Sequence, residues 1–141
     1  MVKEISSMNG NRKKEIKTRV ARIWLDEEGI TTIVYLPDSE ETLEDAEANH
    51  AALTKINKGK KRPLFINPGL QKSVSREARM YYTNHAPEMA TAVAGIITSP
   101  FVKVMANFYI GLNKIINKDD FPLKFFKSEK EAIEWLNQFL E

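Results

Sequence analysis

Residues 62–69 read RPLFINPG, and this stretch decides the fold. Its apolar centre, Leu64-Phe65-Ile66, lies between Arg62-Pro63 and the turn-forming pair Pro68-Gly69. A short unbroken apolar run between turn residues is typical of a strand that is buried on both faces, as strands of parallel sheets are. The stretch therefore predicts a buried strand of a parallel sheet.

A β-hairpin and a crossover helix are predicted before this strand. Apolar and basic residues alternate loosely over 16–25, an apolar run covers 30–36, and the turn between them ends at Gly29, which is expected to take a positive φ. The basic residues of the first run are typical of an edge strand. Thr42 and Asp45 then predict a capping box at the start of the helix.

Helices and strands alternate through the rest of the chain. We first predict a helix that is capped by Ser75 and ends at Ala86 before Pro87, and then a buried strand over 91–97, in which Gly95 indicates a close approach of the backbone. A helix that begins at Ser99-Pro100 and runs to about Ile116 follows. The last elements are a strand over 123–126 and a final helix that begins with the capping box of Ser128 and Glu131. This alternation implies right-handed crossovers. The predicted fold class is α/β, with a mixed, mostly parallel sheet of about five strands, an antiparallel edge strand and about four helices.

Composition limits the class of protein. The 141 residues fit one domain, which we place at 15–141 after a flexible arm over 1–14. The absence of cysteine excludes disulfides and thiol chemistry, and a net charge of +2 does not indicate a nucleic acid partner. The N-terminal segment has no apolar core of a secretory signal, and the apolar stretch 90–112 is interrupted at Ser99-Pro100 and Lys103, so we expect no membrane span and a cytoplasmic location.

No pattern in the sequence indicates catalysis. The six glycines match neither phosphate-binding nor dinucleotide motifs, and no serine lies in a nucleophile elbow. His50 and His85 fall on apolar faces of predicted helices, where hydrogen-bonded core histidines are commoner than ligands or bases. The acidic residues of 40–47 suit a helix start better than a metal site. We expect no enzyme activity, no cofactor and no metal.

The loop over 67–75 is the first candidate binding site. It follows a predicted parallel strand and leads into a helix N-terminus, the usual place for ligands and anions in α/β proteins. Arg76 and Arg79 lie in the first turns of that helix, where positive charge is unfavourable without an anion nearby. The predicted anion or partner site comprises Asn67, Ser73, Ser75, Arg76 and Arg79. Alternatively, the arginines are solvated or pair with Glu77 and other acids.

The predicted helix at 100–116 is the second candidate. Its apolar residues cover an arc of about 160°, whereas covering one sheet face takes about 100°. The excess indicates a second apolar contact, which could be a neighbouring helix, another subunit or an apolar ligand. We predict a homodimer interface at Phe101, Val102, Met105 and Tyr109; the final helix, with Trp135 and Phe139, could cover them instead.

The order of elements resembles the STAS domain, the fold of bacterial anti-sigma factor antagonists, and most closely its uncharacterised SpoIIAA-like branch. The likeness covers residues 16–140. Four segments carry it: Arg62-Pro63 with Phe65-Ile-Asn67, Ser75-Arg-Glu-Ala-Arg79, Ser99-Pro100 with 107–113, and 125–136. These are signatures of fold more than of function.

The resemblance also implies a place for regulation. Phospho-switched STAS domains carry an Asp-Ser-Ser-Gly-like motif at the start of the helix after the third strand, and a serine there is phosphorylated. This chain has Lys72-Ser-Val-Ser-Arg76, without the leading aspartate and the closing glycine. Ser73 or Ser75 could stand in for that serine.

Two functions therefore follow from the sequence. The first is a non-catalytic binding or regulatory module that meets an unknown protein partner or a small anion through the loop over 67–79. The second is a carrier of a small apolar or lipid-like ligand. An enclosed apolar pocket lined by Phe101, Phe108 and Leu112 would favour the carrier, and a solid core with an exposed Ser75 loop would favour the partner-binding module.

Overall fold

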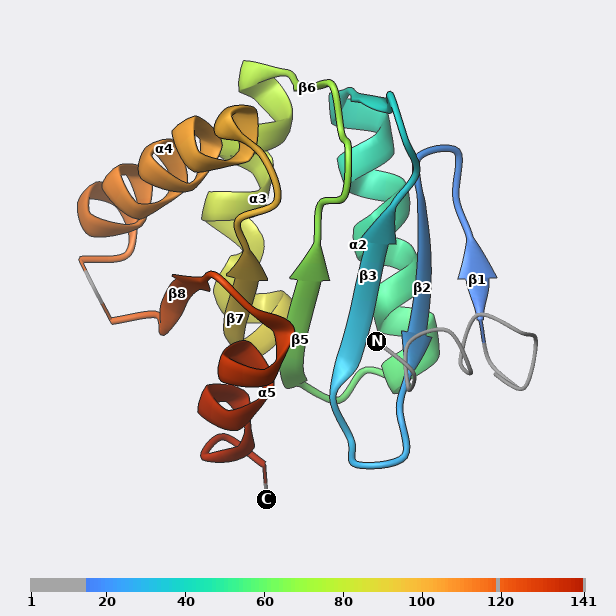
Figure 1. Ribbon diagram of the computed structural model, residues 1–141. Coiled ribbons are helices and arrows are strands. Elements are labelled where there is room, and N and C mark those ends of the chain that lie inside the picture. The colour runs from blue at the N-terminus through green and yellow to red at the C-terminus, as the bar shows by residue number, and fades with distance from the viewer. Residues whose placement is uncertain (1–14, 119, 141) are drawn as a thin grey trace.

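The computed structural model describes residues 15–118 and 120–140, and within these ranges it forms an α/β fold (Figure 1). A six-stranded sheet has the order β1-β2-β3-β5-β7-β8. Its strands are β1 (Ile16–Lys17), β2 (Ala21–Leu25), β3 (Thr31–Tyr35), β5 (Arg62–Asn67), β7 (Ala90–Ile96) and β8 (Leu123–Phe126). The predicted arm over 1–14 lies outside the described residues.

The pairing of the strands confirms a mostly parallel sheet with an antiparallel edge. β1 with β2 and β2 with β3 pair antiparallel, whereas β3, β5, β7 and β8 pair parallel in turn. The single strand predicted over 16–25 divides into two, because Thr18 turns the chain: its backbone N–H donates to the Ala21 carbonyl at 2.9 Å. Gly29 joins β2 to β3 with φ of 99°, as predicted.

Helices cover both faces of the sheet. They are α2 (Leu43–Asn57), α3 (Arg76–Met89), α4 (Pro100–Ile116) and α5 (Glu129–Asn137). Leu53 of α2 and Met89 of α3 pack with Leu64 on one face, and Leu136 of α5 packs with Phe65 on the other. Side chains that alternate along β5 thus supply both cores, and Figure 1 shows α2 and α3 on the side of the sheet opposite α5. No described helix is long and apolar enough to cross a bilayer.

The predicted helix starts are confirmed by their caps. Thr42 Oγ1 accepts from the Asp45 backbone N–H at 3.3 Å, and the Asp45 carboxylate accepts from the Thr42 N–H at 2.9 Å, which completes the capping box. Ser75, Ser99 and Ser128 each accept from the backbone N–H three residues later. These bonds satisfy backbone donors that have no partner within the helix.

The predicted end of α3 is wrong. The helix continues through Pro87 to Met89 instead of ending at Ala86. Proline lacks the N–H that would bond the Thr83 carbonyl, but Asn117 Nδ2 donates to that oxygen at 3.0 Å. A side chain from the end of α4 therefore replaces the bond that the helix loses.

A second, two-stranded parallel sheet was not predicted. It pairs β4 (Glu40–Glu41) with β6 (Ser73–Val74), so that Glu41 lies beside Val74. Each strand has only two residues, too few for any periodic pattern. The pairing brings the segments after β3 and after β5 together at one end of the main sheet.

Candidate ligand-binding site

A partly enclosed cavity of about 110 Å³ lies between the sheet, α3 and α4. Most of its lining residues are apolar or aromatic. The sheet contributes Ile33, Leu64, Ile66, Val93, Leu123 and Phe125, and Phe121 lies just before β8. The helices contribute Tyr82, Ala86 and Met89 from α3 and Phe101, Val102, Met105, Ala106 and Tyr109 from α4. The α3 and α4 residues recur at intervals of one to four, the spacing that places them on one side of each helix. The walls of the cavity are therefore almost wholly apolar.

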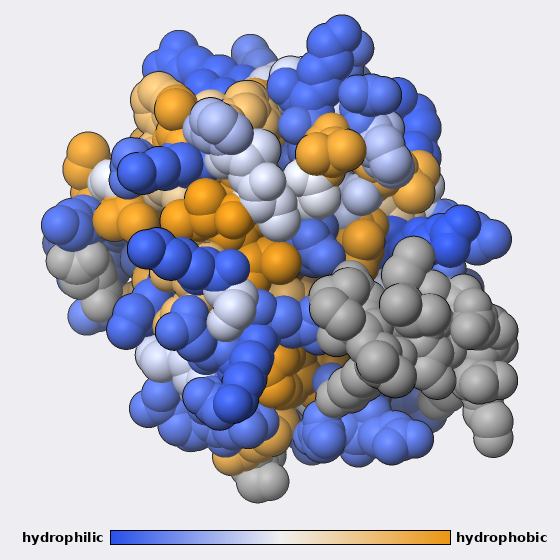
Figure 2. Space-filling model, viewed as in Figure 1, coloured by the Kyte–Doolittle hydropathy of each residue, from blue (hydrophilic) through white to orange (hydrophobic). Residues whose placement is uncertain are grey.

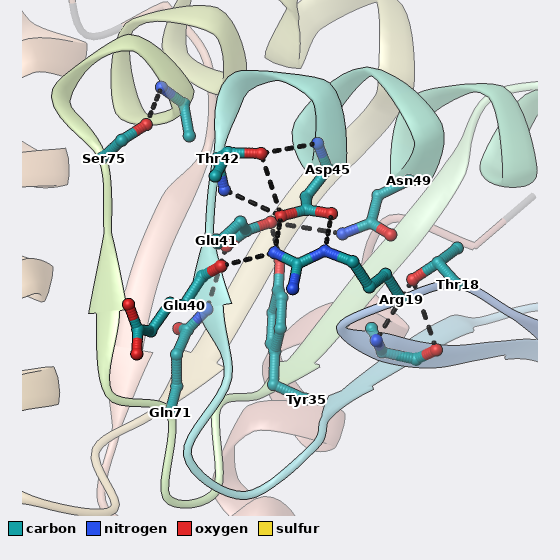
Figure 3. Close-up of polar contacts among 12 residues, drawn as sticks. Thr18, Arg19, Tyr35, Glu40, Glu41, Thr42, Asp45, Asn49, Gln71 and Ser75 are labelled. Atoms are coloured by element: carbon teal, nitrogen blue, oxygen red, sulfur yellow. Dashed lines mark hydrogen bonds and ion pairs between the residues drawn. The ribbon is translucent and has the colours of Figure 1, made fainter.

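One end of this cavity is polar, and Glu41 is its centre. The side chain is 2% exposed. Its Oε2 accepts from the Tyr35 hydroxyl at 3.0 Å, from Asn49 Nδ2 at 3.2 Å and from the Tyr82 hydroxyl. Gln71 Nε2 donates to Oε1 at 2.9 Å. Figure 3 shows the hydrogen bonds that Glu41 makes with the donors from β3, α2 and the loop before β6.

The electrostatics of this end follow from its burial. Loss of water raises the pKa of the Glu41 carboxyl above its ordinary value, while hydrogen bonds from Tyr82, Gln71 and Tyr35 oppose that rise. Burial also raises the pKa of the Tyr82 hydroxyl, and the Glu41 charge adds to the effect. The tyrosines therefore remain neutral donors at ordinary pH.

The Arg19 guanidinium binds a different carboxylate, that of Asp45. Arg19 Nε donates to Asp45 Oδ1 at 2.9 Å, and the Arg19 side chain also donates to the Glu40 carbonyl at 2.7 Å. Hydrogen bonds from Arg19 lower the pKa of the Asp45 carboxyl. Among residues 15–118 and 120–140, Glu41 thus has neutral donors around it and no ion pair.

Three residues of the predicted anion site make contacts within the protein. Ser75 accepts from the Ala78 N–H at 3.1 Å, and Arg79 donates to the Val74 carbonyl at 2.7 Å while it lies 5.2 Å from the ring centre of Phe108. Asn67 Oδ1 accepts from the Gly69 N–H at 3.0 Å.

The other two predicted residues, Ser73 and Arg76, lie in β6 and at the first position of α3. The contacts of Ser75, Arg79 and Asn67 give those residues a role without an anion. The anion site itself stays a prediction.

The four predicted interface residues of α4 line the cavity. Phe101, Met105 and Tyr109 are half-buried, and Val102 is 3% exposed, so the homodimer interface at these residues stays a prediction. The apolar residues that α4 exposes are Val104 (50%), Phe108 (50%) and Ile115 (76%), and Figure 2 shows apolar side chains gathered over this helix.

The two histidines lie together on the surface between α2 and α3. His50 Nδ1 lies 2.7 Å from the Tyr81 hydroxyl, and His85 Nδ1 lies 3.2 Å from Glu88. Both are hydrogen-bonded as expected, although they are only half-buried. No group of three metal-binding side chains occurs in the part of the chain that the structure describes.

The sequence interpretation missed the polar end of the cavity. Glu41 was assigned to the acidic start of a helix, but it precedes the N-cap residue Thr42 and lies in β4. Its partners come from positions 35, 49, 71 and 82, and no local pattern connects them. The pairing of β4 with β6 and these distant partners together bury the carboxylate.

Comparison with known proteins identifies the fold but no activity. A family model described as a domain of unknown function, DUF7793, matches residues 23–140. A similar solved structure is an uncharacterized protein of the DUF3478 family with a SpoIIAA-like fold from Shewanella loihica PV-4, at 16% identity and a TM-score of 0.57, covering 86% of this chain and 98% of that chain. No curated protein matches the chain. The resemblance to the SpoIIAA-like fold is thereby confirmed.

Proposed function

The chain belongs to the DUF7793 family of domains of unknown function, and from its geometry we propose that it is a non-catalytic binding module that holds a small apolar ligand beneath α3 and α4. The observation that carries this proposal is the apolar cavity of about 110 Å³. An apolar cavity of roughly 150 Å³ in another protein stays dry and binds benzene, so this size suits a single ring or a short alkyl chain.

The cavity favours the ligand carrier over the partner-binding loop. Phe101 lines it as the carrier requires, although Phe108 and Leu112 do not. Ser75 and Arg79, on which the partner-binding module rests, already have intramolecular hydrogen bonds. These bonds give both residues a role in the fold without a partner.

Filling the cavity should abolish binding. Ala106 is buried in α4 and lines the cavity, so Ala106→Leu puts extra methyl groups where the ligand would lie. We expect toluene to shift the backbone amide signals of cavity residues in the wild type, and we expect these shifts to be absent in A106L. Because the leucine side chain fills existing empty space, the variant should still fold and lose less than the roughly 1–3 kcal/mol that overpacking a filled core costs.

The matched control for this titration is Val104→Leu, on the exposed side of the same helix. It should titrate as the wild type does. Shifts of equal size in A106L would place toluene elsewhere and contradict the proposal. Native mass spectrometry of protein purified from its own host would then identify any molecule that occupies the cavity naturally.

The exposed face of α4 favours a second function, self-association. We propose that Val104, Phe108 and Ile115 form a two-fold dimer contact, because exposed apolar patches on proteins usually mark interfaces. Ile115→Glu should shift the protein to monomers in sedimentation equilibrium at tens of micromolar, whereas Thr54→Glu on the exposed side of α2 should not. A wild type that is already monomeric at that concentration contradicts the dimer.

A further inference from the structure

Glu41 is the only charged residue among the described residues that line the cavity. An unpaired buried carboxylate is unfavourable, because transfer of a charge out of water costs several kcal/mol. Four neutral donors from Tyr35, Asn49, Gln71 and Tyr82 reduce this cost. No cation among the described residues pairs with the negative charge, and a ligand could supply one.

The hydrogen-bond geometry leaves room for one more donor. A carboxylate has about four acceptor positions, two on each oxygen. Among residues 15–118 and 120–140, three donors share Oε2, whereas Oε1 accepts only from Gln71. The free acceptor position is therefore on Oε1.

The rest of the cavity suits a cation with an apolar body. Five aromatic side chains line it besides Tyr35: Tyr82, Phe101, Tyr109, Phe121 and Phe125. The faces of aromatic rings attract ammonium groups, and more strongly where water is excluded. A carboxylate at one end and aromatic walls beyond it together favour a protonated amine over an anion.

We propose that the cavity recognises small amphipathic amines, with the ammonium group on Glu41 Oε1 and the apolar body along the sheet beneath α4. This inference rests on the proposed binding function and adds the chemical class of the ligand. It also excludes a class, because the Glu41 charge repels carboxylates and phosphates. Fatty acids and anionic lipid headgroups are therefore poor ligands for this end of the cavity.

Three probes with the same ring test the inference: benzylamine, benzyl alcohol and benzoate, titrated at neutral pH and followed by amide shifts. A hydrogen bond to a charged group typically contributes enough to change affinity by roughly tenfold to a hundredfold. We expect benzylamine to bind tighter than benzyl alcohol by that factor, and benzoate to bind weakest. Ala106→Leu should remove the binding of all three, which assigns it to the cavity.

A variant without the Glu41 charge provides the second test of the inference. Glu41→Gln should remove the preference for benzylamine over benzyl alcohol and should strengthen benzoate binding. The control is Glu40→Gln, on the exposed neighbour, which should keep the wild-type order. If E41Q does not fold, the wild-type series still decides, because it requires no variant.

The outcomes separate the two proposals. Binding of benzyl alcohol or benzoate as tight as that of benzylamine overturns the amine inference and leaves the binding function standing. Benzylamine binding that persists in A106L also overturns it, because the amine then lies on surface carboxylates. If neither toluene nor any of the three probes binds, the proposed function itself fails.

Discussion

Glu41→Leu is expected to lower the free energy of unfolding by at least about 3 kcal/mol, because it leaves several buried donors without an acceptor and each such donor costs roughly 1–3 kcal/mol. The four donors come from β3, α2, α3 and the loop before β6, so the carboxylate connects four segments of the chain. Leucine fills a similar volume but accepts no hydrogen bond. Urea denaturation followed by far-ultraviolet circular dichroism measures the loss.

The matched control is Glu40→Leu, the neighbouring carboxylate in β4. Glu40 is exposed, and its contact with Lys72 is an ion pair at 3.6 Å between two exposed side chains. Exposed pairs of this kind contribute little, so E40L should change stability by no more than about 0.5 kcal/mol. Equal stabilities of E41L and E40L would show that the buried carboxylate does not hold these segments together.

The difference in stability between the wild type and E41L should depend on pH, and the pKa of Glu41 gives the sign of that dependence. Burial raises the pKa of the Glu41 carboxyl above its ordinary 4.5, so the folded protein binds this proton more tightly than the unfolded chain does. The stability that protonated Glu41 contributes is complete below the unfolded pKa and falls as pH rises through the folded pKa. The advantage of wild type over E41L should therefore be larger at about pH 4 than at about pH 8. The lowered pKa of Asp45 acts in the opposite direction, but Asp45 is present in both proteins and cancels.

Features with a local cause could be predicted from the sequence. The capping pair Thr42 and Asp45 and the turn at Gly29 lie within a few residues of what they determine, and all are as expected. Gly95 belongs here too: a Cβ at this position would lie 2.7 Å from Phe125 Cε2, so the strand requires glycine. We predicted that another backbone segment would approach Gly95, whereas in the structure the ring of Phe125 lies against it.

Features with a distant cause could not be predicted. α3 passes Pro87 because Asn117 bonds Thr83, 34 positions away in sequence. Likewise, Glu41 is buried by Gln71 and Tyr82, 30 and 41 positions away. A helical wheel gives the arc of apolar residues on α4, but it does not show which part of that arc faces the protein. The candidate site consists of long-range contacts of this kind, which is why it emerged only from the structure.

Leu136→Ala is the second large effect we expect, a loss of about 2–5 kcal/mol of unfolding free energy. Leu136 is 0% exposed and lies at the centre of the core between α5 and the sheet, against Phe65, Ala92 and Ala94. Small neighbours such as alanine cannot move to fill the space left by the missing methyl groups, so the cavity term adds to the lost burial. Leu70→Ala is the control, because Leu70 is exposed and its truncation should change stability by no more than about 0.5 kcal/mol.

This variant also separates stability from binding. The core under α5 and the ligand cavity lie on opposite faces of the sheet, since Phe65 points to one and Leu64 to the other. At a temperature where L136A is still folded, its affinity for benzylamine should therefore equal that of the wild type, whereas A106L should lose binding with a smaller loss of stability. Calorimetric titration beside urea denaturation measures both quantities. If L136A and A106L instead lose affinity in proportion to their loss of stability, probe binding reports the general integrity of the fold and not a cavity on one side of the sheet.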